Sequence, residues 1–179
     1  MTDRDAKNAT SMDAAGDAFA RRADEEAVAL PDRADAGLHF IGRIHTPWTV
    51  RGDCPKNGLQ TDAACTVAVD PRYAPGLQNV EGASHLILLY WMDRAERGLL
   101  VQRPRHADGS RGTFSLRSPA RPNPIALSVV ELLGRDGATL TVRGLDCLDG
   151  TPLLDIKPYY ATTDSRPDAT VDRAGTARA

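Results

Sequence analysis

The sequence predicts an all-β fold, a small antiparallel β-barrel of about six strands with long irregular loops. Short runs that are apolar, or that alternate apolar with polar residues, recur between segments rich in Gly, Pro, Asp and Asn. No long internal helix and no regular alternation of strands with helices is predicted. No GxGxxG follows a predicted strand, so a dinucleotide-type α/β fold has no support.

The expected strands follow this periodicity. The run HLILLYWM at 85–92 is long enough for a buried strand or a buried helix, and its aromatic residues favour the strand. A GRDG turn at 134–137 joins two strands, and the second alternates as a half-buried antiparallel strand does. A further strand at 113–116 leads into a Pro-rich loop, and a short helix is expected near 73–78. The other expected strands are 40–45, 63–69, 125–133, 139–145 and 153–156.

Three parts of the chain are expected to behave differently. Residues 1–37 form an acidic arm that is disordered or weakly helical, with the helix around 14–30, because large apolar residues are scarce there. Residues 38–162 form the barrel domain, and 163–179 form a flexible tail. Residues 1–36 hold nine acidic and five basic side chains, so the barrel is slightly basic although the formal net charge is −2.

Composition favours a soluble globular protein, with 41% hydrophobic and 26% charged residues. No apolar run reaches the roughly 18 residues of a membrane helix. The first residues lack the apolar core of a secretory signal. Cys54, Cys65 and Cys147 are odd in number and lack the spacing of a metal site or a disulfide framework. We therefore expect a cytoplasmic protein without a bound metal.

A Pro-rich loop follows residue 116. Prolines at 119, 122 and 124 exclude a helix or a central strand and make the loop stiff and extended. The loop carries two guanidinium groups and one amide, from Arg117, Arg121 and Asn123. Such a set suits an anionic ligand. The alternative is a rigid connector with solvated arginines.

A second polar loop precedes the last predicted strand. Asp149, Gly150, Thr151 and Pro152 have the composition of a turn. Asp155 and Lys157 lie two residues apart in the extended segment that follows, so their side chains share one face. Such a pair forms a plain salt bridge or binds the polar edge of a ligand.

The segment RSPARPNPIALS followed by LDCLDGTPLLDIKPY closely resembles the signature of the TsaA/TrmO family, and IGRIHTPW and EGASHLILLYWM extend the resemblance over residues 40–160. Members of that family are β-barrel methyltransferases that use S-adenosyl-L-methionine. Bacterial members methylate N6 of threonylcarbamoyl-adenosine next to the anticodon of certain tRNAs. The resemblance implies the same fold, cofactor and substrate here, and a homodimer. Longer members carry a further C-terminal domain, so this chain is expected to be the short, single-domain form.

The resemblance also implies a set of cofactor-binding residues. Arg117 would hold a carboxylate or a phosphate, and Leu127 would supply an apolar wall or a backbone contact. Asn57 stands where Gln is common, Asp93 and Arg94 replace a His-Gln-like pair, and Ala126 replaces Gly. As an alternative, Asp93 and Arg94 form an exposed ion pair. The implied set is Pro55, Lys56, Asn57, Asp93, Arg94, Arg117, Leu127, Asp149, Gly150, Thr151 and Pro152.

The remaining candidates concern the methyl acceptor. Asp155 would take a proton from a weakly nucleophilic nitrogen, and Lys157 would neutralise negative charge on the substrate. Arg121 and Asn123 either orient the substrate or brace their loop. Arg103 and Arg105 belong to a basic loop that either contacts tRNA phosphates or is a solvated hairpin tip. The competing functions are methylation of another RNA or of a small molecule, and a non-catalytic barrel that binds a nucleotide or RNA.

Overall fold

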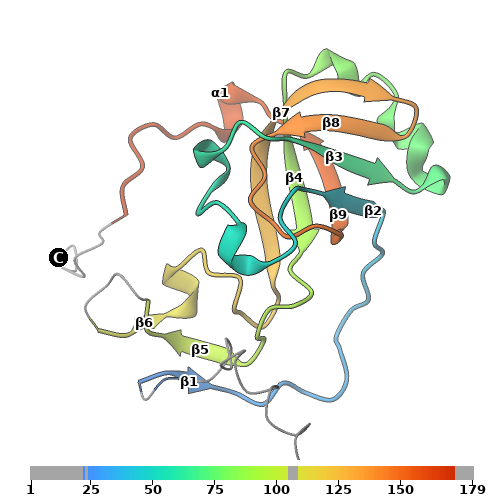
Figure 1. Cartoon of the computed structure of the whole chain (residues 1–179). Helices are drawn as coiled ribbons and strands as arrows, with labels where there is room; N and C mark the ends of the chain where they lie inside the picture. Colours follow the sequence, from blue (N-terminus) through green and yellow to red (C-terminus); the bar gives the residue numbers. More distant parts are fainter. Residues whose placement is uncertain (1–21, 23, 105–108, 172–179) are drawn as a thin grey trace, which may run out of the picture.

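Six antiparallel strands close into a barrel in the order β2-β3-β8-β7-β4-β9, which confirms the predicted fold class (Figure 1). The computed structural model describes residues 22, 24–104 and 109–171. The barrel strands are β2 (Gly42–His45), β3 (Ala64–Val69), β4 (His85–Trp91), β7 (Ile125–Asp136), β8 (Thr139–Arg143) and β9 (Thr151–Pro158).

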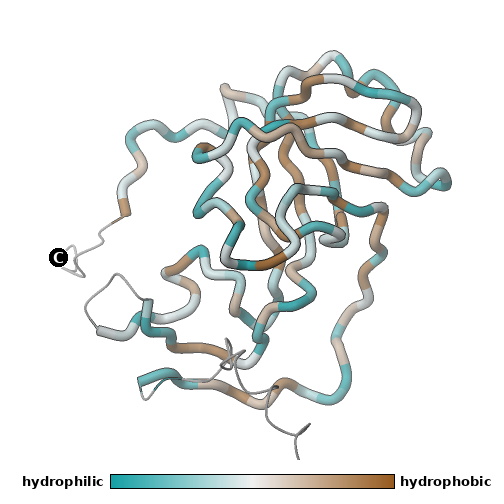
Figure 2. The backbone as a smooth tube through the Cα atoms, viewed as in Figure 1, coloured by the Kyte–Doolittle hydropathy of each residue, from teal (hydrophilic) through white to brown (hydrophobic). Residues whose placement is uncertain are grey.

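Alternating side chains explain why these segments pair as they do. In β4, Leu86, Leu88 and Tyr90 are buried while the residues between them face outward. Ile44 of β2 and Leu153 of β9 are fully buried in the same core. Figure 2 shows hydrophobic residues concentrated along the barrel strands and hydrophilic residues in the connections. The barrel therefore has a filled interior, as expected for a small number of strands.

Two strands extend into residues that were expected to form turns. β7 continues to Asp136, and the tight turn lies at Gly137, whose φ of 57° suits glycine. Thr151 and Pro152 begin β9 and pair with Ile44 and Arg43. The expected turns at 134–137 and 149–152 are therefore too long, because cross-strand pairing extends to residues whose composition favours a turn.

Several short helices connect the strands. The strand expected at 113–116 is wrong: Thr113–Ser115 form a 3₁₀ helix, η5. Thr113 is buried, its hydroxyl donates to the Leu99 carbonyl at 2.8 Å, and the Leu116 N–H bonds back to the Thr113 carbonyl at 3.1 Å. The short helix expected near 73–78 is present as a 3₁₀ helix. That helix is η3 (Pro71–Leu77). The remaining short helices are η1 (Arg51–Asp53), η2 (Gly58–Gln60), η4 (Val80–Gly82) and α1 (Ala161–Asp164).

A second, smaller sheet lies below the barrel in Figure 1 and was not predicted. It consists of β1 (Glu26–Ala27), β5 (Leu99–Gln102) and β6 (Arg111–Gly112) in the order β1-β5-β6. The weak helix expected around 14–30 is absent from residues 24–30, because the backbone there pairs with the edge of β5 instead. The arm before residue 22 lies outside the described residues.

One end of the barrel carries most of the connecting chain. The connections at 46–63, 92–124 and 144–150 leave and re-enter the barrel at the same end, because the strands they join are antiparallel. We call this the loop end. The opposite end has the connection at 70–84 and the short turn between β7 and β8. Among the described residues, no helix has the length and apolar character needed to span a membrane.

Candidate cofactor site

The loop end brings together the three connections that carry the expected cofactor residues. Pro55, Lys56 and Asn57 lie in the connection from β2 to β3, and Asp149 and Gly150 lie immediately before β9. The connection from β4 to β7 holds Asp93, Arg94 and Arg117, and it ends at the start of the strand that contains Leu127. Because each connection lies far from the others in sequence, only closure of the barrel makes them neighbours.

Arg117 is anchored on β7. Its Nη2 donates to the carbonyl oxygen of Leu127 at 3.0 Å. The guanidinium is exposed and has further N–H groups that make no described contact. It is therefore a fixed cation at the loop end with donors directed to solvent, which suits a carboxylate or a phosphate.

Arg121 braces the Pro-rich loop. Its guanidinium donates to the carbonyl oxygens of Ser118 at 2.8 Å, Leu116 at 2.5 Å and Thr113 at 3.4 Å. These bonds brace the Pro-rich loop against the preceding helix η5, and a role in orienting the substrate stays a prediction. Asn123 is exposed, its backbone carbonyl accepts from the Ile125 N–H at 2.8 Å, and its side chain makes no described contact.

Asp149 ties the start of β9 to the end of β2. Its carboxylate accepts from the backbone N–H of Thr46 at 3.2 Å and lies 3.2 Å from Nδ1 of His45. Its own N–H donates to the Trp48 carbonyl at 2.7 Å. Gly150, with φ of 77°, donates to the Ile44 carbonyl at 2.9 Å. This turn therefore holds two of the three loop-end connections together.

The connection at 46–63 packs closely against the one before β9. A Cβ placed on Gly58 would lie 1.9 Å from the carbonyl oxygen of Gly144, so only glycine fits there. The Asn57 side chain accepts from the Leu59 N–H at 3.0 Å and caps η2. The backbone N–H of Lys56 donates to Oε1 of Gln60 at 3.1 Å. Asn57 therefore has a structural contact at its oxygen and retains its amide N–H groups.

Asp93 and Arg94 follow β4 directly and are both exposed. No ion pair joins them within the described part of the chain, unlike the alternative considered above. The Met92 N–H donates to the Pro124 carbonyl at 2.9 Å, which holds this exit beside the start of β7. The two charged side chains are therefore available to a ligand.

Asp155 and Lys157 form an ion pair on the outer face of β9, with 2.6 Å between Nζ and Oδ2. Both residues pair with outward-facing residues of β4, and Leu89 pairs with Asp155 on one side and with Leu127 on the other. Directly paired residues share a face, so Asp155 lies two strands from Leu127, about 10 Å away. The salt-bridge alternative describes the contact between the two side chains.

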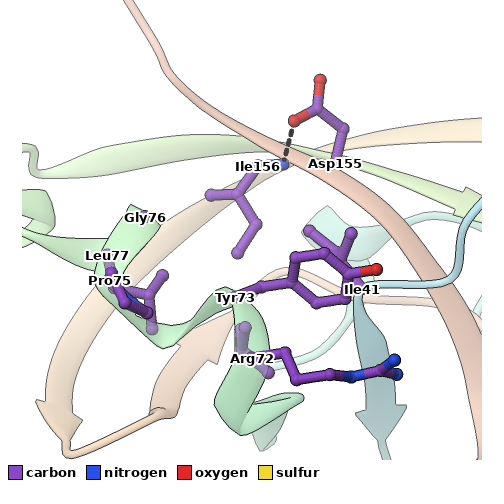
Figure 3. Close-up of a pocket in the computed structure, with 9 residues that line it drawn as sticks. Ile41, Arg72, Tyr73, Pro75, Gly76, Leu77, Asp155 and Ile156 are labelled. Atoms are coloured by element: carbon purple, nitrogen blue, oxygen red, sulfur yellow. Dashed lines mark hydrogen bonds between the residues drawn. The ribbon is translucent and has the colours of Figure 1, made fainter.

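Asp155 also borders a shallow pocket of about 370 Å³ on the side of the barrel away from the loop end (Figure 3). Tyr73 and Ile156 point into this pocket, and the Asp155 carboxylate points away from Tyr73 and Arg72. None of the expected cofactor residues lines the pocket. It is therefore separate from the candidate cofactor site.

A buried hydrogen-bond network of Tyr90, Ser128 and Asp146 lies under the site and was not predicted. The hydroxyl of Tyr90, a residue only 2% exposed, donates to Oδ1 of Asp146 at 3.1 Å and lies 2.9 Å from the Ser128 hydroxyl. Burial, followed by the nearby Asp146 carboxylate, raises the pKa of Tyr90. Burial and then Asp146 also raise the pKa of the Cys54 thiol, so Asp146 lies close to the connection at 46–63. In the sequence, this network was indicated only by Asp146, an acidic residue in the segment LDCLDG at 145–150.

Arg103 of the basic loop is engaged by the N-terminal segment, since its Nη1 lies 2.5 Å from Oδ2 of Asp24. Arg105 lies outside the described residues. In the parts of the chain that are described, no three His, Cys, Asp or Glu side chains gather as metal ligands.

Comparison with known proteins agrees with this geometry. The family model of the tRNA-methyltransferase O N-terminal domain matches residues 43–165. VirR of Rhizobium radiobacter, a probable S-adenosyl-L-methionine-binding protein, is 47% identical over 137 residues, covering 76% of this chain and 78% of VirR. An S-adenosyl-L-methionine-binding protein of Archaeoglobus fulgidus is 44% identical over 127 residues, which cover 71% of this chain and 91% of the Archaeoglobus protein.

Two further matches connect the barrel with tRNA methylation. The tRNA (adenine(37)-N6)-methyltransferase of Escherichia coli is 35% identical over 150 residues, covering 78% of this chain and 64% of the enzyme. The crystal structure of TrmO from Pseudomonas aeruginosa superposes with a TM-score of 0.65 at 32% identity, covering 78% of this chain and 61% of TrmO. The molecule thus has the TrmO type of closed six-stranded barrel. The chain belongs to the tRNA-methyltransferase O family.

Proposed function

We propose that this chain is an S-adenosyl-L-methionine-dependent methyltransferase that methylates N6 of threonylcarbamoyl-adenosine next to the tRNA anticodon. The observation that carries the proposal is the family match over residues 43–165 together with the gathering of the family's cofactor segments at the loop end. The alternatives are methylation of another RNA or of a small molecule, and binding of a nucleotide or RNA without chemistry.

The side chains at the loop end fit the cofactor chemically. The cofactor has an amino-acid carboxylate, a ribose and a purine. Arg117 and Arg94 supply guanidinium donors for the carboxylate, and the Asp93 carboxylate accepts from ribose hydroxyls. The exposed Leu127 side chain supplies apolar surface. The turn from Asp149 to Pro152 and the segment from Pro55 to Asn57 complete the proposed enclosure.

For methyl transfer, the protein mainly has to align the methyl donor with the N6 nitrogen that accepts the methyl group. When bound, S-adenosyl-L-methionine supplies a methyl group on a sulfonium, which the N6 nitrogen takes by direct displacement as the carbon–sulfur bond breaks. Arg117, fixed to the Leu127 carbonyl, orients one end of the site. No nucleophilic residue is needed, which agrees with the buried state of Cys65 and Cys147.

The N6 proton must pass to an acceptor as the new carbon–nitrogen bond forms. Asp155 keeps this proposed role, because it lies on the outer face in the same cross-strand row as Leu127. Lys157 holds its carboxylate through the 2.6 Å ion pair and neutralises negative charge on the threonylcarbamoyl group. Asn123, at the start of β7, is proposed to orient the base.

The outer face of β4 and β7 supports the proposed homodimer. Ile125, Leu127 and Val129 are each more than 40% exposed, and their β4 partners on the same face are Trp91, Leu89 and Ile87. A contiguous apolar strand face of this kind is typical of an interface. A second copy that covers it would exclude water from Leu127 and Asp155. We place this dimer in the cytoplasm, where tRNA is modified.

Two measurements on the purified protein test the proposal. Calorimetry with S-adenosyl-L-methionine should show binding, and labelled methyl should pass from it to total tRNA. Label that persists after ribonuclease treatment would favour a small-molecule acceptor. Tight RNA binding with no transfer of label under any condition would favour the non-catalytic barrel and overturn the proposed reaction.

A further inference from the structure

The N-terminal segment at residues 24–28, which lies outside the family match at 43–165, is docked on the small sheet. β1 pairs with β5, and the Val28 N–H donates to the Gly98 carbonyl at 2.8 Å. The Ser110 hydroxyl donates to the Asp24 carbonyl at 3.0 Å. The segment therefore covers the edge of β5 that would otherwise be open (Figure 1).

The contacts of this segment converge on Arg103. Asp24 accepts from the Arg103 guanidinium at 2.5 Å. Glu25 accepts from the Arg103 backbone N–H at 3.2 Å. Two carboxylates thus occupy both kinds of donor on one residue. A guanidinium combined with a backbone N–H is a typical set of donors for a phosphate oxygen.

The occupied donors belong to the connection that also holds Arg117. The buried Gln102 side chain donates to the Thr113 hydroxyl at 2.8 Å and to the Ala120 carbonyl at 2.6 Å. These bonds join β5 to the Pro-rich loop. An anion held at Arg103 would therefore be fixed relative to the candidate cofactor site.

The N-terminal segment is held weakly enough for another anion to displace it from Arg103. β1 has two residues, and Val28 is 46% exposed, so little apolar surface is buried. The side chains of Arg103 and Asp24 are 51% and 52% exposed, and exposed ion pairs contribute little and are screened by salt. A segment held in this way opens at low cost in free energy.

We propose that residues 24–28 are an acidic strap that occupies a phosphate-binding site at Arg103 and that the RNA backbone displaces. The strap lowers the affinity for RNA in general and leaves the methyl-transfer chemistry unchanged. The identity of the RNA as tRNA rests on the proposed function. The strap itself rests on the pairing of β1 with β5 and on the contacts of Asp24 and Glu25.

Isosteric neutralisation of the two carboxylates that contact Arg103 tests this directly. In the strap variant, Asp24→Asn with Glu25→Gln, tRNA should bind roughly threefold to tenfold more tightly at low salt, and the gain should shrink as salt rises. The control is Glu26→Gln with Asp32→Asn, which removes two negative charges from side chains that have no described contact. Its affinity for tRNA should change less than about twofold.

Arg103→Ala completes the test. Alone, it should change tRNA affinity little, because it removes both the phosphate contact and the strap contact that competes with it. Added to the strap variant, it should remove the gain. Hydrogen exchange at the Val28 N–H of the unaltered protein should quicken when tRNA is added, and melting temperatures show whether the variants fold.

Equal gains in the strap and control variants would reduce the effect to net charge and overturn the proposal. A gain that survives Arg103→Ala, or no gain at all, would also overturn it. Methyl transfer to tRNA by the unaltered protein separates this failure from failure of the proposed function. Transfer with no effect of the strap variant rejects the strap alone, whereas a gain in binding without any transfer rejects the proposed reaction alone.

Discussion

Arg117 is the residue on which the proposed cofactor site depends most. One N–H of its guanidinium is held by the Leu127 carbonyl, and the rest of the group faces solvent at the loop end. We expect Arg117→Ala to weaken S-adenosyl-L-methionine binding by roughly tenfold to a hundredfold, because a hydrogen bond to a charged group contributes about 1.5–3 kcal/mol. Isothermal titration calorimetry measures this change.

Arg72→Ala is the matched control. Arg72 is also an exposed arginine with a fixed guanidinium, paired with Asp70, but it lies in the connection from β3 to β4 at the opposite end of the barrel. It should leave cofactor affinity unchanged. Equal affinity in the two variants, with both proteins folded, would remove Arg117 from the site.

Cys147 makes the stability of the barrel depend on pH. Burial, moderated by a hydrogen bond with Thr151, raises the pKa of its thiol from 9.0 to about 12. The folded protein therefore keeps a proton that the unfolded chain releases, and this contribution to stability is complete below pH 9 and lost as pH rises towards 12. The free energy of unfolding should fall by up to about 1.4 kcal/mol per pH unit in that window because of this group.

Denaturant titrations between pH 8 and pH 11 compare the unaltered protein with Cys147→Ala. The variant should be less stable near pH 8 because it leaves a cavity, but its slope against pH should be smaller by up to one proton. Parallel slopes in the two proteins would contradict the raised pKa of Cys147.

At the residue scale, the sequence predicted which segments carry polar groups, but it did not predict the hydrogen-bond partner of each group. Arg121 was a candidate for binding substrate, and its residue type did not indicate that its guanidinium donates to three carbonyls at 113–118. The network of Tyr90, Ser128 and Asp146 joins three distant parts of the sequence, so no local pattern could indicate it. A hydrogen-bond partner depends on the tertiary fold, which local sequence does not encode.

At the scale of the connecting elements, Gly58 sets the position of the connection at 46–63. A Cβ on this residue would overlap the Gly144 carbonyl, and backbone on both sides leaves no flexible group to move. We expect Gly58→Ala to lower the free energy of unfolding by about 1–3 kcal/mol and to weaken cofactor binding, because the segment from Pro55 to Asn57 must shift. Thermal unfolding and calorimetry measure the two effects.

Gly52→Ala lies in the same connection and is the control, since a Cβ there meets nothing within 4 Å. Its stability should stay within about 0.5 kcal/mol of the unaltered protein. If Gly58→Ala bound the cofactor as well as Gly52→Ala does, this connection would not belong to the site.

The elements that were predicted correctly are those whose own residues decide them. β3, β4, β7 and β8 have alternating or continuous apolar runs that need a core. β1, β5 and β6 have two to four residues each, too few to show a period, so pairing with a neighbour defines them. At 113–116, the buried hydroxyl of Thr113 selects a 3₁₀ turn where composition favoured a strand.

At the scale of the whole molecule, the apolar face of β4 and β7 predicts the oligomeric state. Val129→Asp places a carboxylate in the middle of this face, where Val129 is 44% exposed. We expect it to convert a dimer to a monomer and to reduce methyl transfer, because burying an unpaired charge in an interface is costly. Sedimentation velocity measures the mass in solution.

Val171→Asp makes the same change at an exposed valine outside the barrel and should leave the dimer intact. A Val129→Asp protein that stays dimeric would show that a different surface, or none, forms the interface.

The barrel as a whole could be predicted because six runs without a predicted long helix between them have few ways to bury their apolar residues. The meeting of three connections at the loop end could not be predicted from composition, since it depends on the order of the strands in the barrel. The resemblance to the TsaA/TrmO family supplied that link by naming residues from each connection. The structure brings these segments to the same end of the barrel.

The most direct test of the account is the chemical identity of the methylated nucleoside. tRNA with and without the threonylcarbamoyl modification is incubated with the protein and S-adenosyl-L-methionine, digested to nucleosides and analysed by mass spectrometry. We expect one added methyl group on N6 of threonylcarbamoyl-adenosine and no new methylated nucleoside in the unmodified tRNA. A methyl group on any other nucleoside, or none on the modified adenosine while the cofactor binds, would contradict it.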